Sequence, residues 1–259
     1  MTRQLPPEVA MAPRTTVLPA GTPLWRCHRS DYPATAFKKV EAHTLFGGSR
    51  FDCTADDSYP YLYATLEPTT ALAEVLLRSM DFDPVLGSRI VPWAQASRYT
   101  LTRVVTTAEL TLVSLRAEED LAAVCQDSWL LDSEPDDYPR TRYWAQELRR
   151  QAKDAQGLLW QSRRHRPREA VVLFGDRCGD EPLTSGTASA PVSASASASA
   201  SASDKANTAD TADTADTAVD TTAAYDLSTP AGRDEANRLL APLRAVIMPP
   251  QDREPGPRD

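Results

Sequence analysis

The stretch YLYATLEPTTALAEVLLR, residues 61–78, predicts a strand that leads directly into a helix. Aromatic residues and a threonine favour a strand over residues 61–66, in which side chains alternate between two faces. Tyr61 and Tyr63 therefore point to the same face of this strand. Pro68 suits the first turn of a helix, because its fixed φ matches the helix and its missing N–H is not needed there. We expect the helix to continue to the end of the stretch.

The helix in this unit is apolar almost all round, which is typical of a helix buried in a protein core. Its apolar positions are Ala71, Leu72, Ala73, Val75, Leu76 and Leu77. Glu74 interrupts this surface with a single carboxylate. Two interpretations are open: Glu74 forms an i,i+4 pair with Arg78, or it lies in a protected cavity where a carboxylate takes part in chemistry.

Two arginines upstream of this unit are candidates for binding an anion. Arg26 lies inside the strand LWRCHR, residues 24–29, where burial is costly unless the guanidinium meets an anion. Arg50 follows two glycines in GGSRFD, residues 47–52, and such a turn lets a phosphate approach both the backbone and the planar guanidinium. The plainer alternatives are an edge-strand arginine that reaches solvent at position 26 and a hairpin turn with a solvated arginine at position 50.

A serine ends a short strand further downstream, in GLLWQSRR, residues 157–164. Ser162 is a poor candidate for a hydrolase nucleophile, because the sequence lacks the GxSxG turn that exposes such a serine. The basic run that follows, residues 163–168, is either a solvated loop or a surface that binds nucleic acid.

The remaining pattern mixes strands and helices without the regular βαβ alternation or the GxGxxG turn of a nucleotide-binding fold. Strands are predicted at residues 24–29, 99–107, 110–115, 158–161 and 170–174, and helices at 117–126 and 141–156. Gly157 is predicted to end the second helix in a left-handed conformation. This pattern indicates an α+β fold, with a mixed β core flanked by helices in a single domain.

One stretch differs from the rest in composition: a Ser-Ala run passes into Thr-Ala-Asp repeats over residues 187–223. Because it has almost no large apolar side chain, it cannot offset the entropy of ordering, and we expect a flexible insertion. A helix capped by Ser228 or Thr229, with Pro230 at its first position, follows it, and then a strand at 245–248. We therefore expect one main body at residues 23–178, preceded by a disordered leader at 1–22. The low-complexity insertion follows at 179–224, and a helix and strand at 225–250 pack back on the body. A disordered tail is expected at 251–259.

The chain has 259 residues and a formal net charge of −8, so neither nucleic acid nor an anionic membrane is favoured as a global partner. No run of about 18 apolar residues predicts a membrane span, and the first residues lack the apolar core of a secretory signal. The scattered cysteines and histidines have neither disulfide-framework nor zinc-site spacing. We therefore expect a cytoplasmic protein with reduced thiols and no metal.

These elements, in this order, resemble the RES-domain family, which is named for an arginine, a glutamate and a serine. The matching stretches are LWRCHR, GGSRFD, YLYAT, ALAEVLLR, and GLLWQSRR followed by AVVLFGDR. They cover most of residues 24–177. The resemblance implies an ADP-ribosyltransferase-like fold and a toxin that depletes cellular NAD by hydrolysis or phosphorolysis, with NAD as substrate and no separate cofactor. It also implies an Xre-like antitoxin that covers the active site, and it leaves a homodimer open.

The resemblance also implies roles for individual residues. The catalytic set is Arg26, Glu74 and Ser162, and the substrate-binding set is Arg50, Tyr63 and Tyr61. Cleavage of NAD releases neutral nicotinamide, so the leaving group needs no proton, unlike that of an ordinary glycoside. Positive charge develops on the ribose instead, and the Glu74 carboxylate would stabilise it. The arginines would clamp phosphate or orient the ribose, Tyr63 would face the cationic ring, and Ser162 would hydrogen-bond nicotinamide or its ribose.

Two other functions stay open at the level of sequence. The same fold could transfer ADP-ribose to a macromolecule, because transfer and hydrolysis share one transition state. A nucleic-acid-binding module is the alternative from a different class, and it would use Arg140, Arg142, Arg149, Arg150 and residues 163–168. The acidic total charge and the lack of a recognised DNA-binding pattern argue against this module.

Overall fold

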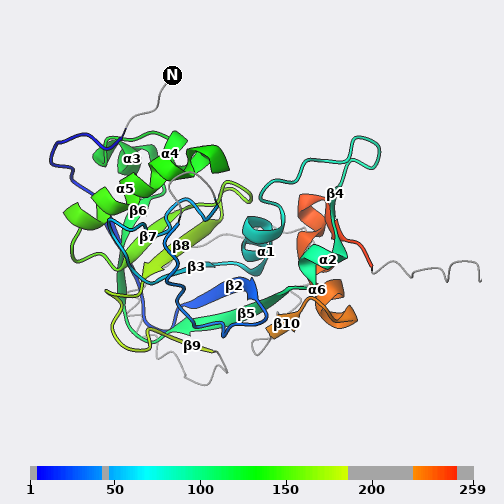
Figure 1. Ribbon diagram of the computed structural model, residues 1–259. Coiled ribbons are helices and arrows are strands. Elements are labelled where there is room, and N and C mark those ends of the chain that lie inside the picture. Colours follow the sequence, from blue (N-terminus) through cyan, green and yellow to red (C-terminus); the bar gives the residue numbers. More distant parts are fainter. Residues whose placement is uncertain (1–4, 43–46, 186–223, 250–259) are drawn as a thin grey trace, which may run out of the picture.

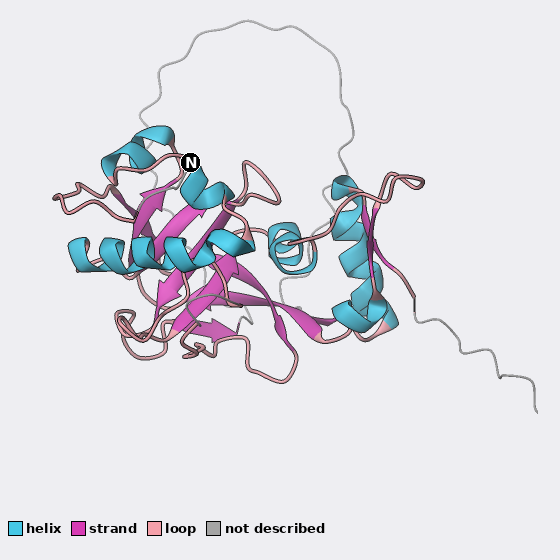
Figure 2. Cartoon of the chain, turned by 45° about the horizontal axis from the view of Figure 1, so that its top comes forward, coloured by secondary structure: helices cyan, strands magenta, loops and turns pink. Residues whose placement is uncertain are grey.

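Figure 1 shows the computed structural model of the protein, which describes residues 5–42, 47–185 and 224–249. Most of the expected insertion and the expected tail, residues 186–223 and 251–259, lie outside the described residues. Within the described ranges, a mixed β-sheet is flanked by helices, so the predicted α+β class is confirmed (Figure 2).

Within the described residues, nine strands form the main sheet, eight of them in one path and β9 attached to β5. In order across the sheet the strands are β1 (Thr15–Leu18), β6 (Leu110–Leu115), β7 (Gly157–Gln161), β8 (Glu169–Phe174), β3 (Tyr61–Thr65), β2 (Pro23–Arg29), β5 (Tyr99–Thr106) and β10 (Ala224–Asp226), and β9 is Leu183–Ser185. Strands β6 and β7 run parallel, whereas β3 runs antiparallel to both of its neighbours, so the sheet is mixed.

Helices lie over the two halves of this sheet separately (Figure 1). The half with β6, β7 and β8 is covered by α3 (Glu118–Ala123), α4 (Trp129–Asp132) and α5 (Tyr138–Gln151), with the 3-10 turn η1 (Pro135–Asp137) before α5. The other half carries α1 (Pro68–Leu76), α2 (Trp93–Ala96), α6 (Pro230–Leu240), the 3-10 turn η2 (Ala241–Leu243) and a small parallel sheet of β4 (Arg89–Val91) and β11 (Ala245–Ile247). Each half has its own cluster of buried apolar side chains.

The sheet divides between β2 and β3, at the junction of these halves. Strand β2 pairs with β5 along all seven of its residues, and β3 pairs with β8 along all five of its residues. Between β2 and β3, in contrast, the register contains the single pair Trp25↔Thr65. The two strands therefore diverge from this pair, and their side chains line a cavity rather than a continuous sheet surface.

Two strands lie in segments that the sequence analysis expects to be disordered or flexible, so those boundaries need correction. Strand β1 lies within the expected leader 1–22, pairs antiparallel with β6 and buries Leu18. Strand β9 lies within the expected insertion 179–224 and pairs with the end of β5, where Leu183 is buried. Both strands are short, and the sheet edge to which they bind, rather than any strong local pattern, determines their conformation.

The prediction for Gly157 is wrong. Helix α5 ends at Gln151, and Gly157 is the first residue of β7, with no left-handed backbone conformation. A Cβ atom at this position would lie 2.2 Å from the carbonyl oxygen of Val172 on the neighbouring strand. The glycine therefore allows close approach of β8, which is a tertiary requirement rather than a helix-ending one.

The C-terminal helix lies against α1. Thr229 is its N-cap, with Oγ1 accepting a hydrogen bond from Gly232 N at 3.1 Å, and Pro230 occupies the first turn as predicted. The Thr69 hydroxyl on α1 donates to the Leu239 carbonyl oxygen at 3.2 Å. Leu240 is fully buried in the same apolar cluster as the core side of α1. Helix α6 thus supports α1 from behind, which fixes the helix that carries Glu74.

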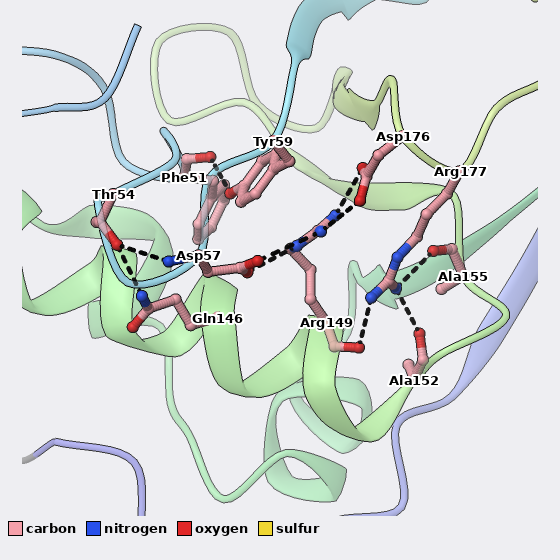
Figure 3. Close-up of polar contacts among 10 residues, drawn as sticks. All are labelled: Phe51, Thr54, Asp57, Tyr59, Gln146, Arg149, Ala152, Ala155, Asp176 and Arg177. Carbon is pink, nitrogen blue, oxygen red and sulfur yellow. Dashed lines mark hydrogen bonds and ion pairs between the residues drawn. The ribbon is translucent and has the colours of Figure 1, made fainter. Parts of the chain in front are cut away.

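An ion-paired arginine joins α5 to the segments that flank β3 and β8 (Figure 3). Arg149 is buried, with its guanidinium 3.8 Å from the ring centre of Tyr59 and 4.6 Å from that of Phe174. It pairs with Asp57 and with Asp176, each at 2.8 Å. Because Asp57 precedes β3 and Asp176 follows β8, this arginine fixes α5 against both strands.

Replacing Arg149 with leucine is expected to lower the free energy of unfolding by about 2 kcal/mol, since two carboxylates lose their common partner. This loss of stability is smaller than the loss from breaking a fully buried ion pair, because the side chains of Asp57 and Asp176 are partly exposed, at 29% and 39%. Thermal denaturation measures the effect. The matched control is Arg150→Leu, one residue away on the exposed face of α5, which should leave the melting temperature unchanged; equal melting temperatures for both variants would contradict this interpretation.

Candidate functional site

A cavity of about 640 Å³ opens where β2 and β3 diverge. Its volume falls within the roughly 300–1,000 Å³ typical of small-molecule sites. Its walls come from β2, from β3, from α1, from the segment 36–40 and from the loop that carries Arg50. Five of the six site residues predicted from the sequence line it: Arg26, Arg50, Tyr61, Tyr63 and Glu74. The sixth, Ser162, contacts Glu74 from the side of β7.

Ser162 holds the carboxylate of Glu74. Its Oγ donates to Glu74 Oε1 at 2.5 Å, and the same Oγ accepts from the backbone N–H groups of Arg164 at 3.2 Å and His165 at 3.1 Å. A hydroxyl has one donor and two acceptor positions, so all three are occupied. The serine is also fully buried. In this arrangement Ser162 positions the carboxylate, and it does not reach the cavity to contact a ligand as the sequence analysis expects.

The alternative i,i+4 pair between Glu74 and Arg78 does not form among the described residues. Helix α1 ends at Leu76, so Arg78 lies beyond the last turn that would bring the two side chains together. Arg78 instead donates from Nη2 to the Ser49 hydroxyl at 3.2 Å, and it lines the cavity. Glu74 is therefore oriented by a neutral hydroxyl rather than neutralised by an adjacent cation.

Arg50 is buried at the cavity wall, which excludes the solvated hairpin arginine considered from the sequence. Its Nε donates to the Ser133 hydroxyl at 3.2 Å, and its Nη2 donates to the Ser133 carbonyl oxygen at 3.3 Å. Its guanidinium lies 5.4 Å from the ring centre of Tyr138. Burial lowers the pKa of Arg50, while Tyr138 and Glu74 oppose this shift. The Nη1 group has no hydrogen-bond partner in the described part of the chain and remains for a ligand.

Helix α5 holds the loop that presents Arg50. The Thr141 hydroxyl donates to the Arg50 carbonyl oxygen at 2.7 Å, and Arg142 Nε donates to the Ser49 carbonyl oxygen at 3.2 Å. Gly48 adopts a φ of +73°, and a Cβ there would lie 2.8 Å from Arg142 Nη2. The glycine is thus needed both for the turn and for the approach of Arg142. Sequence patterns did not single out Ser133, Thr141 or Arg142 for this role, because they lie more than 80 residues from the loop.

Arg26 lies in an interior strand, so the edge-strand alternative does not hold. Its Nη1 donates to the carbonyl oxygens of Ala34 at 2.5 Å and Ala36 at 2.9 Å. Burial lowers the pKa of Arg26 to about 10, which leaves it charged at neutral pH. This arginine fixes the segment that closes the cavity, and its Nε and Nη2 form no hydrogen bond with any residue that the structure describes.

The two tyrosines form one aromatic wall. Tyr63 Oη accepts from Phe51 N at 2.9 Å, and its ring meets those of Tyr61 and Trp160 edge to face, with ring centres 5.9 and 6.2 Å apart. The Tyr61 hydroxyl donates to the Val40 carbonyl oxygen at 3.1 Å. Burial raises the pKa of both tyrosines, so both stay neutral at physiological pH. The wall is therefore rigid and uncharged.

The cavity is strongly cationic although the chain is acidic. Among the described residues, its charged lining consists of one carboxylate, that of Glu74, and the cations Arg26, Arg29, Lys38, Lys39, Arg50 and Arg78. The sequence analysis did not predict Arg29, Lys38 and Lys39 at the site, because only the fold places their segments beside β3. A low-dielectric cleft lined by one sign of charge attracts ligands of the opposite sign. The site thus favours an anionic ligand with a cationic part next to Glu74.

The arginines proposed for a nucleic-acid surface have other partners. Arg149 and Arg142 are buried, Arg140 pairs with Asp137 at the end of η1, and Arg150 pairs with Glu147 on α5. In the basic run, Arg163 and Arg166 pair with Glu134 and Asp132, and Arg168 pairs with Glu67. These pairs disfavour a continuous basic surface.

In the described ranges, no group of three or more His, Cys, Asp or Glu side chains could hold a metal ion. No described helix combines the length and apolarity that a membrane span requires.

Comparison with known proteins identifies one family. The model of the RES domain family matches residues 23–193 of the chain. No curated protein sequence matches. Among solved structures, a chain of the M. tuberculosis MbcT–MbcA toxin–antitoxin complex superposes with a TM-score of 0.43 and 15% sequence identity, over 64% of this chain and 82% of that one.

The Ser162–Glu74 contact is expected to contribute to folding as a coupled pair. A double-mutant cycle with Ser162→Ala and Glu74→Ala should show a coupling of about 1–2 kcal/mol in the free energy of unfolding, because a hydrogen bond to a charged group is lost in each single variant. Chemical denaturation of the four proteins measures it. Combining Ser162→Ala with the remote Arg150→Ala serves as the control and should be additive; additivity in the first cycle as well would show that the contact does not form.

Proposed function

The chain belongs to the RES-domain family, and from that premise we propose that it cleaves the bond between nicotinamide and ribose in NAD and acts as the toxin of a toxin–antitoxin pair. One observation carries the chemical part of the proposal: a single oriented carboxylate, Glu74, lies in a cavity whose other charged groups are all cationic. This distribution matches a substrate that has a pyrophosphate at its centre and a positive ring at one end.

The reaction needs charge stabilisation more than proton transfer. As the bond between C1′ and the ring nitrogen breaks, its electron pair stays on nicotinamide, which leaves as a neutral molecule. Positive charge then develops on the ribose, and the Glu74 carboxylate lies where it can stabilise this charge. Water completes a hydrolysis to ADP-ribose with release of one proton, or phosphate completes a phosphorolysis to ADP-ribose 1″-phosphate.

The other site residues bind and position. Arg26 and Arg50 each use part of the guanidinium on the protein and keep unbonded N–H groups for phosphate oxygens. Tyr63, fixed by the Phe51 N–H, offers an aromatic surface to the cationic ring. Ser162 orients Glu74 and has no lone pair left for attack on the substrate. NAD enters as the substrate, and these steps require no additional cofactor.

A separate inhibitor is part of the proposal. An enzyme that consumes NAD must be restrained while it is synthesised, and the cationic cavity defines what the inhibitor must offer. We expect an Xre-like antitoxin that places a carboxylate or its own C-terminus against Arg26 or Arg50.

Glu74→Gln should reduce NAD cleavage about a hundredfold without unfolding the protein, since losing a transition-state interaction of roughly 3 kcal/mol has that effect on rate. The assay measures nicotinamide released from NAD with and without phosphate. Its products separate three outcomes: ADP-ribose indicates hydrolysis, ADP-ribose 1″-phosphate indicates phosphorolysis, and label retained on protein indicates transfer. The control is Glu119→Gln, an exposed carboxylate on α3. Turnover by a folded Glu74→Gln protein within about threefold of wild type would exclude the role of Glu74.

Expression of the chain alone is expected to arrest growth and lower cellular NAD, whereas co-expression with the protein encoded beside it should do neither. The Glu74→Gln variant, expressed alone at the same level, should leave growth and NAD unaffected. Growth and NAD are measured together, so that a non-specific burden of expression can be recognised. Normal growth and normal NAD in cells that contain abundant wild-type protein would refute the toxin assignment.

A further inference from the structure

The cations of the cavity fall into two groups along β3. Ser162 and Glu74 lie at the Thr65 end of this strand, because β7 and β8 pair there through Trp160, Ala170 and Thr65. Arg50 and Arg78 belong to the same end, since Arg78 follows the helix that carries Glu74 and donates to the hydroxyl of Ser49, the residue before Arg50, at 3.2 Å. These two arginines and the carboxylate form the inner end of the cavity.

The outer group lies at the opposite end of the strand. Lys38 pairs with Tyr61 through two backbone hydrogen bonds, of 2.9 and 2.8 Å, and Lys39 follows it. Arg29 ends β2 at the same side, four residues beyond the single β2–β3 pair at Trp25. The length of β3, five residues, separates the two ends by roughly 15 Å. Arg26 comes between them on β2.

Among the described residues, the outer cations have a single ion pair between them. Lys38 lies 5.7 Å from the ring centre of Tyr61 and pairs with no carboxylate among the described residues, and the same is true of Lys39. Arg29 has one exposed ion pair, with Asp31 at 3.3 Å, which contributes little in water. All three residues line the cavity. They are therefore available to an anionic group of a ligand.

An extended dinucleotide would place different groups at these two ends. With the nicotinamide ribose beside Glu74, the pyrophosphate comes next and meets Arg50 and Arg26. The adenosine ribose then lies toward the outer end. Arg50 and Arg26 account for the pyrophosphate of NAD, so the outer group faces a ribose that in NAD bears no charge. A phosphate on the 2′-hydroxyl of that ribose would supply the missing anion.

We propose that the outer cations, Arg29, Lys38 and Lys39, form a site for a third phosphate. The substrate class then includes nicotinamide dinucleotides that are phosphorylated on the adenosine ribose, and NADP is cleaved in preference to NAD. The proposal rests on the proposed function. The chemistry is unchanged: the electron pair of the glycosidic bond leaves with neutral nicotinamide, water adds to the ribose carbon, one proton is released, and the product is ADP-ribose 2′-phosphate.

The test compares kcat/KM for NADP and NAD with the full-length protein at low and at physiological ionic strength. Wild type should favour NADP by about tenfold, and the double variant Lys38→Ala, Lys39→Ala should lose that preference through a higher KM for NADP. Because Arg29, Lys38 and Lys39 are exposed, added salt should weaken the preference for NADP. The control removes the same number of charges far from the cavity, with Arg150→Ala and Lys153→Ala, and should keep the wild-type ratio.

Equal kcat/KM values for the two dinucleotides, or a ratio that the double variant does not change, would overturn the third-phosphate site while NAD cleavage stands. Binding of the products gives a readout independent of turnover. ADP-ribose 2′-phosphate should bind wild type about tenfold more tightly than ADP-ribose does, and the two should bind the double variant equally. If neither dinucleotide is cleaved, the proposed function fails, and this binding ratio still decides the phosphate site: equal affinities in wild type refute it.

Discussion

Strands β2 and β3 pair only at Trp25 and Thr65, and the rest of each strand faces its neighbour without a hydrogen-bonded ladder. Buried backbone polar groups must find partners, so this divergence has to be compensated. Lys38 provides the compensation for β3, because its backbone N–H and carbonyl oxygen pair with Tyr61. Arg26 on β2 then holds the same connecting segment through the carbonyl oxygens of Ala34 and Ala36. At Tyr61 this segment, and not β2, supplies the backbone partners of β3, and the cavity opens between the segment and the two strands.

Helices that contribute little to the cavity lining determine its shape. Helix α5 lies behind the Arg50 loop and holds it through Thr141 and Arg142, and its own position depends on Arg149. Helix α6 plays the corresponding role behind α1, which carries Glu74. The two opposite charges of the inner site are thus carried by separate structural units. Their relative position is set by packing across the sheet rather than by any direct contact between Arg50 and Glu74.

Charge distinguishes the cavity from the chain as a whole. A chain with a net charge of −8 concentrates six cationic side chains around one carboxylate, and the surrounding field should draw anions toward this opening in particular. The same property would make the opening a suitable contact for an acidic segment of an inhibitor. Substrate binding and restraint would then depend on the same guanidinium groups, so that an inhibitor bound there excludes the substrate directly.

The local pattern of the sequence indicated the α+β class and most strands and helices, and it singled out Arg26, Arg50 and Glu74 as unusual, whereas the full set of six candidate site residues came from the resemblance to the RES-domain family. The local features depend on alternation, on the first-turn proline of α1 and on a lone carboxylate in an apolar helix, all of which act within a few residues. Only the tertiary structure decided that β1 and β9 form, that Gly157 serves the contact with β8, and that Ser162 turns toward Glu74 rather than the ligand. It also brought Ser133 to Arg50 across 83 residues of sequence. Such contacts depend on which segments the folded chain places side by side, and no local preference of the residues involved specifies that choice.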